Sequence, residues 1–197
     1  MRLSAYICAL PESAARDIIS REKGMDPEIT EYIIMYRIAQ FMRVSRERFA
    51  ADWEFDAPNP YDELKLPRRG TAGSAGYDFY SPVDFTLAPG EVIKIPTGMR
   101  AKIDDGWVLV ICPRSGQGFK YRLQLYNTVG VIDSDYFGAD NEGHIFIKLT
   151  NVNHEGKVLS VKKGEAFAQG IFLPYGVTVD DDAADKRTGG FGSTDRK

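Results

Sequence analysis

The sequence contains few residues of the kinds that build metal centres, disulfide frameworks or membrane spans. Only two cysteines, Cys8 and Cys112, and two histidines, His144 and His154, occur among its 197 residues. Two distant cysteines exclude a disulfide-stapled scaffold and a cysteine-rich zinc site, and two histidines leave little for a histidine-built metal centre. No apolar run approaches the roughly 20 residues that a membrane-spanning helix needs. We therefore expect a reducing, cytoplasmic location.

An excess of positive charge is missing as well. The chain has 25 Lys and Arg against 28 Asp and Glu, a net charge of −3. This balance argues against a broad surface for nucleic acid or anionic membranes, so we expect neither as a partner. Hydrophobic residues make up 43% and aromatic residues 12% of the chain, enough for one substantial domain with a real core.

The first 60 residues have a helical pattern. The run Asp26-Pro27-Glu28 is typical of a helix start, since an Asp oxygen can cap the helix and Pro needs no N–H partner in the first turn. Apolar residues then follow at helical spacing, namely Ile29, Tyr32, Ile33 and Tyr36. A second, short helix is predicted after Ser45, with Phe49 and Trp53 on one side, and the prolines within 57–60 end this section.

Beyond this section the pattern changes to strands and turns. Short apolar or alternating segments recur between turns rich in Gly, Pro or Asp, at residues 91–95, 99–103, 107–112, 144–149, 158–161 and 167–173. In 144–149, Ile145, Ile147 and Leu149 alternate with His144, Phe146 and Lys148, which predicts a half-buried strand with one apolar face. Many short strands with close turns are typical of a sandwich, jelly roll or barrel.

Five segments bring Gly, charged and aromatic residues together where a β core would not need them. They are Ala75-Gly76-Tyr77-Asp78, Pro113-Arg114-Ser115-Gly116, residues 127–136, residues 164–169 and residues 187–194. Each segment alone has an ordinary explanation, because turns often contain such residues and a lone Asp commonly satisfies backbone N–H groups. Their joint occurrence in one order is what distinguishes the chain.

Together and in this order the five segments resemble the motifs of the trimeric dUTPases, from about Leu64 to the last residues. The resemblance implies an all-β core of the dUTPase type, a jelly roll or distorted β-barrel, over 61–179. It also implies a homotrimer with active sites between subunits, and Mg²⁺ as cofactor. We assign residues 1–60 to a short N-terminal helical extension and 180–197 to a C-terminal lid. Residues 1–34 are expected to be dispensable for activity and trimer formation.

The implied activity is hydrolysis of dUTP to dUMP and pyrophosphate by Mg-assisted water attack on the α-phosphorus, which keeps uracil out of DNA and supplies dUMP for dTMP synthesis. Such a reaction depends on positioning and on neutralising phosphate charge. Arg114 offers planar donors to phosphate oxygens, and Ser115 and Gly116 allow hydroxyl and backbone donors to approach. Gln169 is suited to orienting a phosphate oxygen or a water.

By resemblance, Asp133 orients and deprotonates the attacking water, a task that suits a carboxylate. Mg²⁺ would be held mainly by triphosphate oxygens and waters, which explains why the sequence has no cluster of direct metal ligands. Asp78 would act on the hydrated ion from outside its ligand shell, or serve a purely structural role.

The resemblance assigns uracil selection to the hairpin 127–136. Asn127 and the backbone of Gly130, Val131 and Ile132 would bind the base, in a pocket too small for a 5-methyl group. Tyr136 would pack under the deoxyribose and exclude a 2′-hydroxyl. The remaining contacts are assigned to the lid, in which Phe191 would stack on uracil and the terminal phosphates would meet Arg187, Gly192, Ser193 and Thr194.

The chain departs from the family pattern at three places. The Arg that usually stands five positions before the lid Phe is Lys186 here, so we expect Arg187 to contact the γ-phosphate, with Lys186 as second candidate. Asp195 replaces a small residue after the lid's Ser-Thr pair. The segment 137–142 makes the region after the third motif about four residues longer than usual.

Two enzymatic and two non-enzymatic hypotheses are compatible with this sequence pattern. A dCTP deaminase shares the fold, but Lys148 stands where that family would need a Glu. A non-catalytic nucleotide-binding regulator would be expected to have lost Asp133 or Arg114, and both are present. A viral jelly-roll structural protein would not need five ordered polar motifs. The interpretation that we carry forward is a dUTP diphosphatase.

Overall fold

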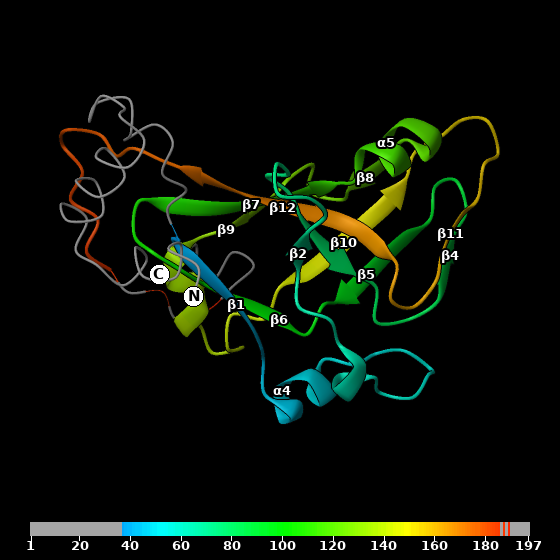
Figure 1. The fold of residues 1–197 in the computed structure, drawn as a ribbon, viewed down its shortest axis with the longest axis horizontal. Helices are drawn as coiled ribbons and strands as arrows, with labels where there is room; N and C mark the ends of the chain where they lie inside the picture. Colours follow the sequence, from blue (N-terminus) through cyan, green and yellow to red (C-terminus); the bar gives the residue numbers. More distant parts are fainter. Residues whose placement is uncertain (1–36, 186, 188, 190–197) are drawn as a thin grey trace, which may run out of the picture. The chain divides into compact units, whose positions relative to one another are not determined.

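The computed structural model of the chain describes residues 37–185, 187 and 189. Its described elements are mostly short antiparallel strands, joined by two short α-helices and two 3₁₀-helices, η1 and η2 (Figure 1). In chain order they are β1 (Ala39–Arg43), α4 (Arg46–Ala51), η1 (Tyr61–Glu63), β2 (Arg68–Arg69), β3 (Tyr77–Tyr80), β4 (Phe85–Leu87), β5 (Val92–Pro96), β6 (Met99–Ile103), β7 (Trp107–Pro113), α5 (Ser115–Tyr121), β8 (Leu123–Leu125), β9 (Gly130–Ile132), η2 (Ser134–Gly138), β10 (Phe146–Asn151), β11 (Leu159–Val161) and β12 (Ala166–Pro174).

The strands form four antiparallel sheets. The largest has the order β2-β3-β12-β7-β9, the second has the order β5-β10-β8, and β1-β6 and β11-β4 are two-stranded. Several neighbours in these sheets are far apart in sequence; β12, for example, lies between β3 and β7. The predicted all-β class is confirmed, and all six predicted strands are present.

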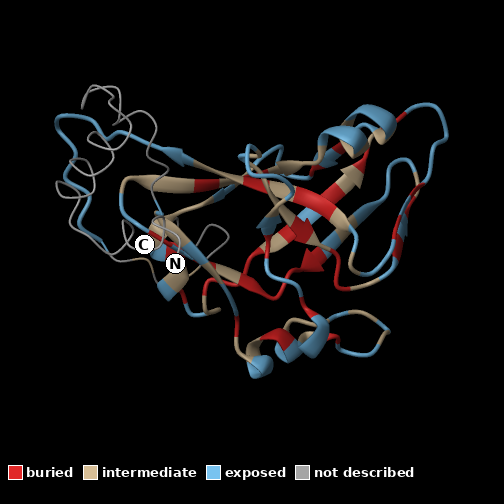
Figure 2. Cartoon of the chain, viewed as in Figure 1, coloured by how far each residue is buried: buried red, intermediate tan, exposed pale blue. Residues whose placement is uncertain are grey.

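The core follows from alternation along the strands. In β10, Ile147 and Leu149 are buried while Lys148 between them is exposed. Buried positions gather along β12, β10 and β5 (Figure 2). The largest fully buried side chains include Phe49, Phe79, Phe167, Ile95, Leu109, Ile111 and Ile145. His144 differs from the prediction, because it is fully buried instead of lying on the polar face of a strand.

The short helix predicted after Ser45 is confirmed as α4. Ser45 caps it, since its side-chain oxygen accepts a hydrogen bond from Arg48 N at 3.0 Å. Phe49 is fully buried on the inner side of the helix, and its ring lies 5.4 Å from that of Trp53. The helix predicted from Asp26 lies outside the described residues.

Residues 38–60 pack with the β core. The compact unit begins at Ile38. Strand β1 pairs with β6 from Ala39↔Ile103 to Arg43↔Met99, and Phe41 packs against the rings of the core. Periodicity within the first 60 residues carries no information on a partner strand 60 residues away, so this pairing is visible only in the structure.

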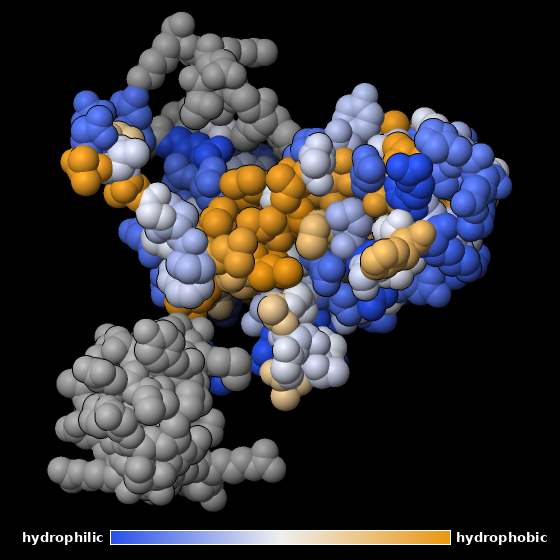
Figure 3. All heavy atoms as spheres, turned by 90° about the horizontal axis from the view of Figure 1, so that it is seen from above, coloured by the Kyte–Doolittle hydropathy of each residue, from blue (hydrophilic) through white to orange (hydrophobic). Residues whose placement is uncertain are grey.

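The large sheet has an apolar outer face. Leu109 and Ile111 of β7 point into the core, so their neighbours Val108 and Val110 lie on the opposite side. The cross-strand partners on that side are apolar as well, namely Val131, Ile171 and Leu173. Seen from above, hydrophobic residues gather over β7 and β12 (Figure 3). Exposed apolar patches of this kind commonly mark interaction surfaces.

Candidate active site

Arg114 stands where β7 ends and α5 begins. Its backbone is extended and its carbonyl accepts from Gly118 N at 2.9 Å, so the side chain leaves at the first turn of the helix. Its Nε lies 3.0 Å from Oδ1 of Asp78 on β3, and its Nη1 lies 3.4 Å from the carbonyl of Ala166. Asp78 therefore orients the guanidinium, a contact that the sequence did not predict.

Gln169 is held beside Arg114 by the register of the large sheet. It pairs with Asp78 on one side and with Cys112 on the other, and its Nε2 donates to the carbonyl of Pro113 at 3.1 Å. A Cβ at Gly76 would lie 2.7 Å from Gln169 Oε1, so a larger residue there would require the Gln169 amide to move. Burial raises the pKa of the Cys112 thiol, so it stays protonated next to Gln169.

These side chains line a cavity of about 490 Å³, which we call the Arg114 cavity. Its lining combines cations with hydroxyl and amide donors, and includes Asp78, Arg114, Ser115, Gly116, Lys120 and Gln169. A guanidinium held by a carboxylate, with neutral donors around it, suits an anion that has several oxygens. The structure thus brings together Arg114, Ser115, Gly116 and Gln169, which are among the residues predicted to bind phosphate.

The second group of predicted residues lies on the β8–β9 hairpin. The turn has Thr128 in the left-handed region at φ 70°, and Gly130 packs against Ile111 of β7, where a Cβ would lie 3.1 Å from that side chain. The hairpin and η2 enclose a pocket of about 190 Å³, which we call the Asn127 pocket. Its lining includes Asn127, Gly130, Val131, Ile132, Asp133, Tyr136 and Arg187.

Asp133 and Arg187 form an ion pair at this pocket. Nη2 of Arg187 lies 2.5 Å from Asp133 Oδ2, and its Nε donates to Asp135 Oδ1 at 2.8 Å. Its guanidinium carbon lies 5.9 Å from the ring centroid of Tyr136. Arg187 is therefore on the Asp133 side in this subunit. The other predicted lid residues, Lys186, Phe191, Gly192, Ser193 and Thr194, lie outside the described residues.

The two groups of residues lie at opposite ends of β7. Ile132, next to Asp133, pairs with Leu109, whereas Arg114 follows the last residue of the strand. Leu109 and Arg114 are five steps apart along an extended chain, about 17 Å. The Arg114 cavity and the Asn127 pocket also share no lining residue. A single subunit therefore does not bring all the predicted residues to one place.

The described residues contain no direct metal centre. Within residues 37–185, 187 and 189, no group of three or more His, Cys, Asp or Glu could hold a metal ion. The carboxylate nearest to the phosphate-binding side chains, Asp78, already pairs with Arg114. In the same part of the chain, no helix is long and apolar enough to cross a membrane.

Lys148 has the surroundings of a surface lysine. It lies opposite Lys94 in the β5–β10 pair, and its Nζ lies 4.0 Å from the ring centroid of Tyr126. The position that a deaminase would need as a carboxylate therefore carries a cation stacked on an aromatic ring.

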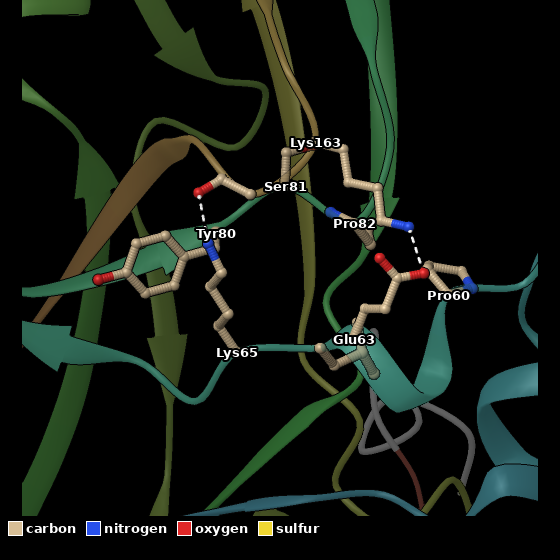
Figure 4. A pocket seen from close by; sticks show the side chains of 9 residues that line it. Pro60, Glu63, Lys65, Tyr80, Ser81, Pro82 and Lys163 are labelled. Carbon is tan, nitrogen blue, oxygen red and sulfur yellow. Dashed lines mark hydrogen bonds and ion pairs between the residues drawn. The ribbon is translucent and has the colours of Figure 1, made fainter.

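A further cavity of about 200 Å³ lies between η1, the end of β3 and the turn before β12 (Figure 4). Lys163 and Glu63 form an ion pair at 2.8 Å on one side, and Lys65 reaches the carbonyl of Gly164 at 3.5 Å on the other. Its cations are thus engaged by the protein itself, and no predicted site residue lines it.

Two side chains that contact predicted site residues, Asp135 and Asn141, and the neighbouring Glu142 were not predicted from the sequence. Asp135 shares Arg187 with Asp133, although the motif that contains it was recognised. Asn141 donates to the hydroxyl of Tyr136 at 2.7 Å, and Glu142 ties the same segment to Ser45. The extra length of the segment 137–142 was the only sequence feature that pointed to Asn141 and Glu142, and no role could be predicted from it.

Comparisons with known proteins agree with this geometry. A family model described as dUTPase matches residues 62–195. The deoxyuridine 5′-triphosphate nucleotidohydrolase of Lactococcus lactis subsp. lactis (strain IL1403) is 45% identical over 134 residues, which cover 66% of this chain and 88% of the relative. The protein of that name from Tolumonas auensis (strain DSM 9187 / NBRC 110442 / TA 4) is 38% identical over 143 residues, covering 68% and 90%.

A solved structure extends the agreement to the fold. The crystal structure of dUTPase from Streptococcus mutans superposes with a TM-score of 0.54 at 32% identity, covering 72% of this chain and 98% of that one. The predicted dUTPase-like jelly roll is thereby confirmed. On the family model, the sequence identity and the fold together, the chain belongs to the dUTPase family.

Proposed function

We propose that the protein hydrolyses dUTP to dUMP and pyrophosphate by attack of a water molecule on the α-phosphorus. The relatives named above carry this activity in their names, and the motifs of the chain are complete. One observation carries the proposal: the Asn127 pocket has the Asp133 carboxylate at its edge, and that side chain is 47% exposed. A half-exposed carboxylate beside a base-sized pocket can orient a water and take its proton.

The Asn127 pocket is suited to a pyrimidine nucleoside. Its volume of about 190 Å³ is of the order of one ring and a sugar. Asn127 and the backbone of Gly130, Val131 and Ile132 would bind the base edge. Tyr136 forms a wall that is only 7% exposed, against which the deoxyribose would pack. Close packing of this kind rejects an added methyl or hydroxyl group by steric exclusion.

The Arg114 cavity would hold the phosphates. Arg114, Ser115 and the Gly116 backbone would donate to phosphate oxygens, and Gln169 would orient an oxygen or a water. A bound Mg²⁺ would supply further neutralisation of phosphate charge. Since Asp78 orients Arg114, any contact of Asp78 with that ion would run through a water.

Asp133 can act as a base only when Arg187 leaves it. In the structure the Arg187 guanidinium lies 2.5 Å from Oδ2 of Asp133, so it occupies the place that a water would need at that oxygen. Transfer of Arg187 to the γ-phosphate would free the carboxylate, and the same step would close the lid residues Phe191, Gly192, Ser193 and Thr194 over the substrate.

The full site would form in a homotrimer, between subunits. Two observations support this assembly: the separation of the Arg114 cavity from the Asn127 pocket along β7, and the apolar outer face of the same sheet next to Val131. A neighbouring subunit on that face would bring its Arg114 cavity to this subunit's Asn127 pocket and bury the apolar side chains.

The first experiment measures pyrophosphate release from dUTP, dCTP, dTTP and UTP in the presence of Mg²⁺. We expect fast release from dUTP alone, and a loss of about 100-fold to 10,000-fold in kcat for Asp133→Asn. Asp140→Asn, an exposed neighbour in the same region, is the matched control and should keep wild-type activity. Ammonia release from dCTP would favour the deaminase, and binding without any turnover would favour a regulator.

A second experiment tests the shared site. Asp133→Asn and Arg114→Ala are each expected to be inactive alone. Unfolding the two variants together and refolding them as a mixture should restore part of the activity, because some sites then combine an intact Arg114 with an intact Asp133 from different subunits. A mixture that stays as inactive as its components would contradict a site shared in this way.

A further inference from the structure

The hydroxyl of Tyr136 is held from two sides. It donates to the carbonyl of His144 at 2.8 Å and accepts from Nδ2 of Asn141 at 2.7 Å. A carbonyl can only accept, so the direction of both bonds is set by chemistry. The Tyr136 ring is 7% exposed and lines the Asn127 pocket. The ring that would support the sugar is therefore anchored at its far end by Asn141.

The backbone conformation around Asn141 directs its side-chain amide toward Tyr136. Its Oδ1 accepts from Gly143 N at 3.2 Å, which turns Nδ2 toward the tyrosine. Glu142 and Gly143 both adopt positive φ, 60° and 69°. A Cβ at Gly143 would lie 2.6 Å from the carbonyl oxygen of Tyr136, so the chain can return this closely to the tyrosine only with glycine.

This segment, residues 137–144, is fastened to the core at several points, and we call it the Asn141 segment. The Glu142 carboxylate accepts from the backbone N–H and the hydroxyl of Ser45, at 2.7 and 2.6 Å. Arg100 of β6 donates to the carbonyl of Phe137 at 2.6 Å, and its guanidinium carbon lies 3.6 Å from the Phe137 ring centroid. The positive φ of Glu142 is thereby stabilised from outside the segment.

The C-terminal end of the Asn141 segment is anchored by His144, which is fully buried. Its Nε2 accepts from Gly98 N at 2.8 Å, so the proton lies on Nδ1, which donates to Asp52 Oδ2 at 2.7 Å. Asp52 in turn pairs with Arg48 of α4. Both ring nitrogens of His144 are therefore hydrogen-bonded. These bonds hold in place the residue whose carbonyl accepts from the Tyr136 hydroxyl.

From these contacts we infer that Asn141 is a positioning residue that sets the selection of deoxyribose over ribose. The inference rests on the proposed function, because it assumes that Tyr136 packs against the sugar. A wall that excludes one oxygen atom has to keep its position within a fraction of that atom's size. The Asn141 segment supplies that support, and the extra residues after the third motif thereby acquire a role in specificity.

The test compares dUTP with UTP. We expect Asn141→Ala to lower the ratio of kcat/KM for dUTP to that for UTP by about fivefold to tenfold, the size of one lost hydrogen bond, through improved kcat/KM for UTP. Asn141→Asp keeps the size and the acceptor for Gly143 N but removes the donor, so it should lower the ratio similarly. In a Tyr136→Phe background, Asn141→Ala should change the ratio less than twofold.

The matched control is Asn153→Ala. Asn153 is also a buried loop amide, 5% exposed, and its Nδ2 donates to the carbonyl of Lys157, away from both cavities. This variant should lower the melting temperature and leave the dUTP to UTP ratio unchanged. A wild-type ratio in both Asn141 variants, or an equal fall in the ratio for Asn153→Ala, would overturn the inference.

The ratio of dissociation constants for non-hydrolysable imido analogues of dUTP and UTP separates this inference from the proposed function. If the wild-type protein binds the deoxy analogue but hydrolyses nothing, the proposed hydrolysis fails. The inference then stands or falls on whether Asn141→Ala lowers the ratio of binding constants.

Discussion

The Arg114 cavity and the Asn127 pocket differ in what surrounds their principal side chains. Arg114 is 43% exposed in a cavity of about 490 Å³, and one carboxylate and a backbone carbonyl hold it. Tyr136 is 7% exposed at a pocket of about 190 Å³, with a second layer of bonded residues behind it. Attraction between charges acts over several ångströms and tolerates an open setting, whereas exclusion by shape needs a wall with support behind it.

Among the substitutions that test this difference between the two cavities, Asp78→Asn is expected to have the largest effect. Asp78→Asn removes the charged partner of Arg114, and we expect kcat/KM for dUTP to fall about tenfold to a hundredfold, the size of one charge-assisted hydrogen bond. The ratio of dUTP to UTP hydrolysis should stay at its wild-type value, because the sugar pocket is untouched. Steady-state kinetics on both nucleotides measures this.

The control for this prediction is Asp84→Asn. Asp84 pairs with Lys162 on the surface and lines neither cavity. Its kinetics should match those of the wild type. A changed dUTP to UTP ratio in Asp78→Asn would mean that the two regions are coupled, and the comparison drawn above would fail.

An intermediate effect is expected at Gly143. Gly143→Ala forces a side chain against the Tyr136 backbone in a left-handed conformation, and should lower the free energy of unfolding by about 1–3 kcal/mol. It should also weaken the discrimination against UTP, since Tyr136 has to shift. Gly138→Ala in the same region has no atom within 4 Å of the new Cβ and should be close to neutral. Chemical denaturation of both variants decides the point.

The smallest effect is a pH dependence that arises from His144. Burial lowers its pKa below the usual 6.5, although the neighbouring Asp52 and Glu142 favour the charged form, and Arg48 opposes it. Protonating Nε2 would also break its bond from Gly98 N. As the pH falls below about 6.5 the unfolded chain takes up this proton first, so the free energy of unfolding should decrease from pH 7.5 to 5.5, by at most about 1.4 kcal/mol per pH unit.

The two histidines provide the control for this measurement. His144→Asn should remove the loss of stability between pH 7.5 and 5.5, whereas His154→Asn, at an exposed position, should retain it. The pKa of Glu142 is lowered by its hydrogen bonds from Ser45, so its own contribution is lost only below about pH 4.5 and leaves this window clear. A pH profile that is identical in both variants would exclude His144 as the source.

Local patterns predicted much of the fold. The strand at Met99–Ile103 and the helix after Ser45 lie where turn residues and the spacing of apolar residues predicted them. Helix α5 was not predicted, because its two glycines, Gly116 and Gly118, are poor helix formers. Of the site, the sequence indicated the residues of both cavities. It did not indicate that Asp78 pairs with Arg114, or that Arg187 lies beside Asp133 in this subunit.

By itself, the sequence determined the β class, most strand positions, the family and the residues of the five motifs, because each depends on neighbours along the chain. Only the tertiary structure decided that β1 joins the core, that His144 is buried and that Asn141 reaches Tyr136. These features depend on contacts between residues far apart in the chain or on a backbone held at positive φ from outside. Local secondary-structure propensity does not predict these features, because the packing and hydrogen bonds that stabilise them exist only once the sheets have formed.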